Sequence, residues 1–173
     1  RILRGEGSFD PETTRLDPKT GQGAPYATYA FASHLAEVEV DTETGKVKVN
    51  RVIASHDVGK AIHSQNVMGQ IMGGVAMGTG FALMEEYVPG EATSFVNYRI
   101  PTSKDVPEVI PIIVEDEEPT GPFGAKGVGE PALIPSAPAI LNAIADAIGQ
   151  RIYHLPANLE RVLEAVQKSK GKM

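Results

Sequence analysis

The sequence contains no cysteine. It therefore has no disulfide framework, no thiolate metal site and no cysteine-ligated iron-sulfur cluster, so any redox group must be held in another way. An excess of basic residues is also missing, since 16 Lys and Arg stand against 22 Asp and Glu, for a formal net charge of -6. Because nucleic-acid binding relies on clustered basic side chains, we expect no nucleic-acid partner.

A long apolar run is absent as well. The longest weakly polar stretch, 67–84, is rich in glycine and too short for a comfortable membrane span, and the first residues form no apolar signal segment. We therefore expect a cytoplasmic protein with no membrane association. The 42% hydrophobic and 22% charged residues are typical of a globular domain, and the start without Met predicts a piece of a longer chain.

The hydrophobic pattern changes along the chain and predicts an α+β fold with a mixed sheet. Residues 1–25 have no apolar period and indicate an extended connection or loop, which leaves 26–173 as the folded domain. Alternating apolar residues in 26–40 and 47–53 predict a β-hairpin with Gly45 as its left-handed turn residue. The remaining segments read as a glycine-rich helix at 64–86, a strand at 109–114, an apolar helix capped by Gly149 and a last amphipathic helix from Leu159 to Val166.

The predicted helix at 64–86 carries five glycines, each of which costs up to about 1 kcal/mol relative to alanine in a helix interior. Two explanations remain open. The glycines allow close packing of this helix on a sheet, or they leave room for a bulky, rigid group against the helix face.

The segment 121–131, GPFGAKGVGEP, places a glycine loop before what we predict to be a helix opening at Pro131. Such a loop presents backbone N–H groups to an anion or to the polar edge of a cofactor, although its spacing matches neither a Walker A loop nor a dinucleotide-binding motif. Glu130 is a candidate functional carboxylate, or an acidic residue that favours the helix dipole. Lys126 is a candidate cofactor ligand, or the ion-pair partner of Glu130.

Histidine and serine offer no comparable motif. The four histidines lack the i, i+4 spacing of a zinc helix, and His56 and His63 are expected in a loop between a strand and a helix. Ser64 and Ser136 have no recognisable catalytic partners and no nucleophile elbow. We predict no protein-ligated metal.

Three segments, in this order, resemble the large subunits of the xanthine dehydrogenase/aldehyde oxidoreductase family of molybdenum hydroxylases. They are HDVGKAIH at 56–63 followed by GQIMGGVAMGTGFALMEE at 69–86, then NYRIPT at 97–102, and GAKGVGEP at 124–131. The chain differs from the family's usual pattern at Met77, His63 and Ala132. The resemblance implies the C-terminal, molybdopterin-binding part of such a subunit, with the α+β fold of that domain in the xanthine oxidase family.

The same resemblance implies roles for individual residues. Glu130 matches the catalytic base in the hydroxylation of an electrophilic C–H carbon of a purine, another N-heterocycle or an aldehyde, with water as the oxygen source. The cofactor would be molybdenum on molybdopterin, which supplies the sulfur ligands itself and often occurs as its cytosine dinucleotide. The residues matched to its binding are Gln70, Gly73, Gly74, Lys126, Gly127, Val128 and Gly129.

The resemblance further implies that the site is completed by other chains or segments. We expect the remaining part of the molybdenum subunit, an iron-sulfur partner and, in many cases, an FAD partner. Two alternatives remain open from the residues themselves: a phosphate or nucleotide-binding module built on 121–129 with Lys126, and a non-catalytic assembly domain in which the glycine helix is a packing face.

Overall fold

In the described part of the chain, three strands form a mixed sheet in the order β1-β2-β3. The computed structural model describes residues 2–171. Strand β1 (Ala32–Val40) pairs antiparallel with β2 (Val47–Asp57), and β3 (Glu108–Val114) lies parallel to β2 on its other side. The predicted α+β fold and hairpin are confirmed, and Gly45 adopts the expected left-handed conformation, with a φ of 76°.

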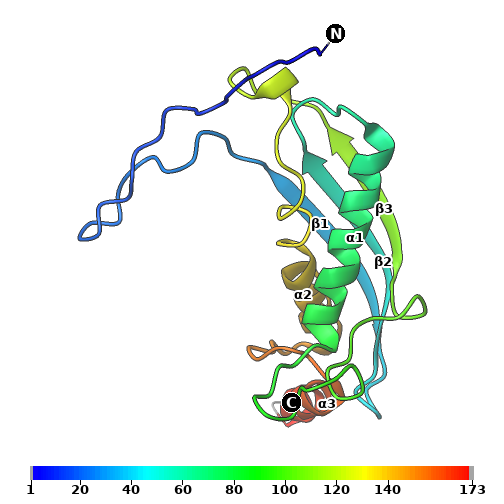
Figure 1. Cartoon of the computed structure of the whole chain (residues 1–173). Coiled ribbons are helices and arrows are strands. Elements are labelled where there is room, and N and C mark those ends of the chain that lie inside the picture. The colour runs from blue at the N-terminus through cyan, green and yellow to red at the C-terminus, as the bar shows by residue number, and fades with distance from the viewer. Residues whose placement is uncertain (1, 172–173) are drawn as a thin grey trace.

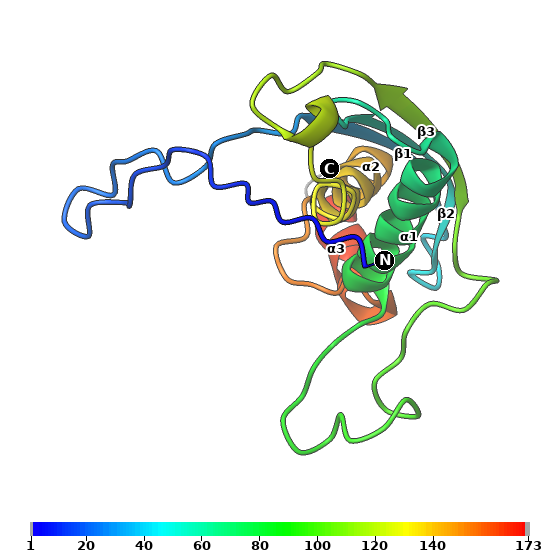
Figure 2. The same cartoon turned by 45° about the horizontal axis from the view of Figure 1, so that its top comes forward.

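One face of the sheet is covered by helices. Helix α1 (Ser64–Leu83) lies over β2 and β3, α2 (Ser136–Ile148) lies over β1, and the two helices pack side by side, as Figures 1 and 2 show. Helix α3 (Leu159–Lys170) packs against α2 near the C-terminal end of α2. The core between these layers is made of fully buried side chains, among them Val52, Ile71, Ile140 and Val162.

Strand β2 runs through the centre of the sheet and keeps its apolar side chains on the covered face with the help of a β-bulge. The register with β1 shifts between Glu37 and Val38, so that Arg51 faces Glu37 while Val49 faces Val38. Because a bulge inserts one residue, Val49 and Val52 are both buried although they are three positions apart. On the uncovered face Arg51 forms ion pairs with Glu37 and Glu108 at 3.7 and 3.4 Å.

The helix ends are capped, and the cap at Gly149 is the one predicted. His63 caps α1, with its Nδ1 accepting the N–H of Asn66 at 3.2 Å, and the Asn158 side chain caps α3 in the same way at 3.0 Å. Gly149 ends α2 in the left-handed conformation, with a φ of 70°. His63 therefore lies at the start of α1, in the predicted loop, whereas His56 lies inside β2 and is buried, which corrects its expected loop position.

Three predicted elements end at other residues than expected, since β2 continues to Asp57, α1 ends at Leu83 and α3 continues to Lys170. Two predicted starts are wrong by five or more residues. The first strand begins at Ala32 rather than Tyr26, because β2 ends at Asp57 and its ladder leaves no partner for residues 26–30. Helix α2 begins at Ser136 rather than at Pro131. A helix from Pro131 would place Pro135 in its interior, where its ring clashes with the preceding turn and an N–H is lost. Residues 130–135 instead form turns.

The described residues before β1 contain no helix or strand and extend away from the sheet as an arm (Figures 1 and 2). A local pairing holds the arm's loop, with Thr14 N–H donating to the Ala24 carbonyl at 2.8 Å and Asp17 N–H to the Gln22 carbonyl at 2.7 Å. The division at residue 25 stays a prediction, and residues 1, 172 and 173 of the predicted segments lie outside the described residues. Within 2–171, no helix is both long and apolar enough to cross a membrane.

Candidate cofactor-binding site

The N-terminal half of α1 lies beside the loop that carries Glu130. A Cβ atom added to Gly129 would lie 3.9 Å from the Gln70 side-chain nitrogen. Gln70 is exposed on α1, and Gly129 and Glu130 are exposed on the loop. The structure thus brings together three of the residues singled out from the sequence, although 59 positions separate Gln70 from Gly129.

The glycines of α1 divide into two groups with different surroundings. A Cβ added at Gly69 or Gly73 would meet no atom within 4 Å. At Gly74 it would lie 2.6 Å from the backbone of Ala132, and at Gly78 it would lie 2.3 Å from the Ser136 side chain. Close packing therefore explains Gly74 and Gly78, whose partner is the segment 132–136 rather than the sheet, and Gly80, which packs against Pro101. Gly69 and Gly73 leave the helix face open, and the bulky group expected there stays a prediction.

Gly69, Gln70 and Gly73 share one open face of α1. An α-helix turns by about 100° per residue, so these three positions lie within about 100° of one another around the helix axis. Gly127 on the neighbouring loop is equally open, since an added Cβ meets nothing within 4 Å. We call these four residues, with Gly129, the glycine surface. At each glycine of this surface an added Cβ meets no atom closer than 3.9 Å.

The loop 127–129 has free hydrogen-bond donors on its backbone. Among the described residues 2–171, no acceptor receives the backbone N–H of Gly127, Val128 or Gly129. Val128 turns its half-buried side chain onto the core, which holds the loop against the body. The carbonyl of Glu130 accepts the N–H groups of Leu133 and Ile134 at 2.9 and 3.3 Å, which fixes the turn that follows.

The Glu130 carboxylate is exposed, and no side chain of the described part of the chain bonds to it. Since α2 begins only at Ser136, the expected position of Glu130 at a helix N-terminus is wrong, and the helix dipole does not act on it at short range. The expected alternative of a Lys126 ion pair is also wrong. Lys126 contacts Asp57 and Asp116, at 2.6 and 3.8 Å, instead.

The Asp57–Lys126 ion pair is largely sheltered, with side-chain exposures of 8% and 6%. Burial alone would raise the pKa of Asp57, but the hydrogen bonds from Lys126 and the Gly59 N–H, with the charge of Lys126, lower it below its ordinary value. The hydrogen bond to Asp57 raises the pKa of Lys126, against the opposing effect of desolvation. Both groups stay charged at neutral pH.

A sheltered polar cluster that sequence reasoning missed joins β1, β2 and α2. The Nε2 atoms of His34 and His56 lie 2.6 Å apart, and His34 Nδ1 lies 3.2 Å from the Ser136 hydroxyl oxygen. Burial, and secondarily the charge of His56, lowers the pKa of His34 to about 4, and burial lowers the pKa of His56. The hairpin register could have signalled the contact, because His34 and His56 are diagonal neighbours across β1 and β2.

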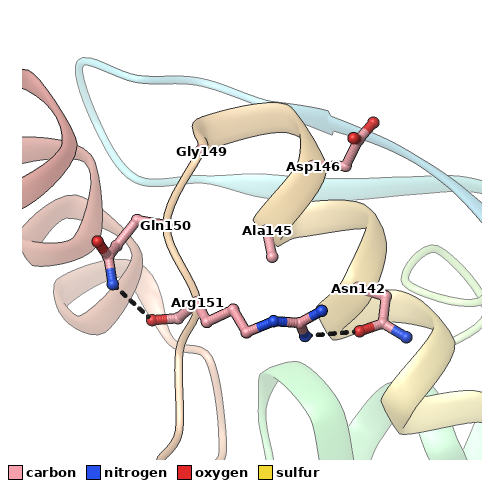
Figure 3. Close-up of a pocket in the computed structure, with 6 residues that line it drawn as sticks. All are labelled: Asn142, Ala145, Asp146, Gly149, Gln150 and Arg151. Carbon is pink, nitrogen blue, oxygen red and sulfur yellow. Dashed lines mark hydrogen bonds between the residues drawn. The ribbon is translucent and has the colours of Figure 1, made fainter.

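Two hollows on the surface contain neither Gln70 nor Glu130. Figure 3 shows the first, of about 420 Å³, at the C-terminal end of α2, where Arg151 donates to the Asn142 side chain at 2.8 Å. The second, of about 610 Å³, is an apolar groove between α1 and α2 lined by Met77, Phe81 and Leu141, among others. No group of three or more potential metal ligands occurs within residues 2–171.

The fold has a known counterpart in an oxidoreductase. The structure of aldehyde oxidoreductase from Desulfovibrio gigas superposes with a TM-score of 0.86 at 39% sequence identity, over 90% of this chain and 17% of that one. Residues 1–107 match the family model described as the molybdopterin cofactor-binding domain, so the chain belongs to that family.

Curated relatives agree with this assignment and with the resemblance seen in the motifs. Aldehyde oxidoreductase of Megalodesulfovibrio gigas is 41% identical over 157 residues, 89% of this chain and 17% of that protein. A probable xanthine dehydrogenase subunit of Bacillus subtilis is 38% identical over 170 residues, 96% of this chain and 22% of that protein. The chain therefore spans about a fifth of the length of these relatives.

Proposed function

We propose that this chain forms one wall of the molybdopterin site of a molybdenum-dependent hydroxylase, with Glu130 as the catalytic base. The observation that carries the proposal is the meeting of the open glycine face of α1 with the loop 127–130, where Gln70 lies beside Gly129, the residue before the exposed Glu130. The family membership says which cofactor such a surface would take.

The residues present suit a flat, polar group. The open sides of Gly69, Gly73 and Gly127 let a rigid ring system approach the backbone closely, and the unpaired N–H groups of 127–129 are donors for its polar edge. Gln70 would add a side-chain amide. Gly74 lies under Ala132, so we propose a packing role for it in place of direct contact, and Lys126 is held by Asp57 and acts from behind the loop.

The chemistry divides between the cofactor and the chain. When bound, the molybdenum–pterin group supplies the two-electron redox chemistry, and the pterin supplies the sulfur ligands of the metal. Glu130 would supply a carboxylate oxygen that accepts a proton during hydroxylation of an electrophilic C–H carbon with water-derived oxygen, and the two electrons of the broken C–H bond would go to the molybdenum–pterin group. A base must lie within hydrogen-bond distance of the proton it accepts, and the turn 130–134 and the packed Val128 hold the backbone on either side of Glu130.

The finer parts of this function are proposals too. We infer a purine, a related N-heterocycle or an aldehyde as substrate, and the names of the relatives include both aldehyde and xanthine enzymes. We further propose a cytosine dinucleotide form of the pterin, iron-sulfur and FAD groups in partner subunits, and a cytoplasmic location. The remaining part of the molybdenum subunit would close the site, because this chain spans about a fifth of its relatives.

The nucleotide-binding alternative loses its main side chain. It relied on Lys126 to meet a phosphate, but the Lys126 ammonium lies 2.6 Å from Asp57 and is 6% exposed as a side chain. The loop would then have to bind phosphate through backbone N–H groups alone.

The test is Glu130→Gln in the protein purified from its native host with whatever proteins remain bound. We expect kcat for purine or aldehyde oxidation to fall at least about 100-fold, the usual contribution of a positioned general base, while molybdenum and pterin contents stay unchanged. Glu43→Gln, in the exposed hairpin turn 41–46, is the matched control and should keep full activity. A preparation rich in molybdenum in which Glu130→Gln turns over normally would refute the role of Glu130. Absence of metal in the complete preparation would refute the proposed function itself.

A further inference from the structure

Two short segments far apart in the sequence are joined edge to edge behind the loop of Glu130. The turn after β2, residues 57–60, and the loop 124–126 share a β-bridge between Gly59 and Ala125. Lys126 N–H donates to the Val58 carbonyl at 2.9 Å, and Lys60 N–H donates to the Gly124 carbonyl at 2.7 Å. Gly59 has a φ of 62°, and a Cβ there would lie 2.3 Å from the Gly124 carbonyl oxygen, so the approach requires glycine.

A charged pair locks this junction. Lys126 Nζ lies 2.6 Å from Asp57 Oδ2, while Asp57 Oδ1 accepts the Gly59 N–H at 3.0 Å. The backbone of Asp57 is tied in turn to the arm side of β1, since its N–H donates to the Phe31 carbonyl at 2.9 Å. Both oxygens of the carboxylate are thus engaged, one with each side of the junction, in a sheltered position where unpaired charge is unfavourable.

The junction lies at one end of the segment that carries Glu130. Three residues separate Lys126 from Glu130, and two of them are the conformationally permissive Gly127 and Gly129. At the other end Ala132 is fully buried against Gly74. Glu130 therefore stands between two anchors, and on its N-terminal side the Asp57–Lys126 pair holds the loop together with the packed side chain of Val128.

We propose that Asp57 and Lys126 are positioning residues that set the place of the Glu130 carboxylate relative to the glycine surface. The proposal rests on the proposed function for the identity of the reaction. It assigns the ion pair no contact with the substrate. Its effect comes from geometry, because a displacement of about 1 Å of a catalytic group costs as much as about 100-fold in rate.

The test uses Asp57→Asn and Lys126→Met in the holoprotein with its bound partners. Asparagine keeps the shape of aspartate and still accepts the Gly59 N–H, so this variant is expected to fold. Each variant should lower kcat per bound molybdenum about 10- to 100-fold with KM changed less than about threefold, and the double variant should lose no more than the single ones. The matched control is Arg161→Met, which breaks the Arg161–Glu86 ion pair. This pair has an N–O distance of 2.7 Å, close to the 2.6 Å between Lys126 and Asp57, and its loss should leave kcat per molybdenum unchanged.

A second readout needs no turnover. Amide hydrogen exchange at Lys126 and Leu133, whose N–H groups donate to Val58 and Glu130, should accelerate at least about 10-fold in Asp57→Asn and stay unchanged in Arg161→Met. Unchanged exchange in Asp57→Asn would overturn the proposal, as would loss of bound molybdenum with kcat per remaining metal at the wild-type value. Glu130→Gln in the same series separates the two ideas. If it is inactive while Asp57→Asn and Lys126→Met are fully active, the positioning role fails and the proposed function stands.

Discussion

Glycines on the two faces of helix α1 have opposite surroundings. On the covered face Gly74 and Gly78 let the segment 132–136 approach so closely that a single methyl group would collide with it. On the open face Gly69 and Gly73 have no neighbour within 4 Å of an added Cβ, and in a helix such glycines are destabilising without any packing in return. We infer from the difference that the covered glycines serve the fold, while the open ones need a partner from outside this chain.

The largest difference in stability between the two faces of α1 is expected when two residues adjacent in the sequence, Ile71 and Met72, are each replaced by alanine. Ile71 is fully buried, whereas Met72 is 47% exposed. Ile71→Ala should lower the free energy of unfolding by about 2–5 kcal/mol, because the transfer and cavity terms add. Met72→Ala should change it by less than about 0.5 kcal/mol. Denaturant titration of both variants measures the contrast, and equal losses would show that α1 is buried all round.

The stability of the folded chain should also depend on pH through His34, which lies on the face of the sheet covered by α2. The folded-state pKa of about 4 lies below the ordinary value of 6.5, so the unfolded chain binds more protons between these values. The contribution of His34 to the free energy of unfolding is then fully present above pH 6.5 and is lost as the pH falls toward 4. Allowing for the partial exposure of this histidine, we expect a loss of about 2 kcal/mol, measured by denaturant titration at several pH values.

His34→Gln should flatten this part of the pH profile, while His154→Gln, at a histidine outside the cluster, should leave it unchanged. A profile that keeps its full slope in His34→Gln would place the sensitivity elsewhere.

Replacing the glycines of α1 should change the stability less than Ile71→Ala does, and the sign should differ between the two faces. Gly74→Ala places a Cβ 2.6 Å from the Ala132 backbone, so overpacking should outweigh the gain in helix propensity and cost about 1 kcal/mol. Gly73→Ala meets no atom within 4 Å and should raise stability by up to about 1 kcal/mol in the absence of cofactor. Thermal unfolding of the two variants measures the difference in sign.

Cofactor content sharpens the same comparison. In the protein purified from its native host, Gly73→Ala should lower the molybdenum and pterin content although it stabilises the helix, because the methyl group occupies the glycine surface. Elemental analysis beside thermal unfolding separates the two effects. Undiminished molybdenum in Gly73→Ala would mean that this face carries no cofactor.

Local patterns in the sequence predicted most of the fold. The hairpin with Gly45, strand β3, the capped end of α2 at Gly149 and helix α3 all follow from periodicity and turn chemistry within a few residues. The errors at Tyr26 and Pro131 arose where the outcome depends on a partner or on a second proline further along. A strand needs a neighbour to pair with, and Pro135 decides where α2 can begin.

The candidate site was predictable only in part. The motifs singled out Gln70, the loop 127–129 and Glu130, and the structure places Gln70 beside Gly129. The pairing of Lys126 with Asp57 joins residues 69 positions apart, and nothing in the local spacing of either residue signals it. The same holds for the different surroundings of the α1 glycines, because only tertiary contacts distinguish Gly73 from Gly74.

The most direct test of the central claim is an experimental structure of the protein purified from its native host with its bound partners and cofactor. We predict pterin against Gly69, Gly73 and Gly127, within reach of the Gln70 amide, and the Glu130 carboxylate facing the metal. Polypeptide packed over these glycines, with the pterin held elsewhere, would contradict the proposed site.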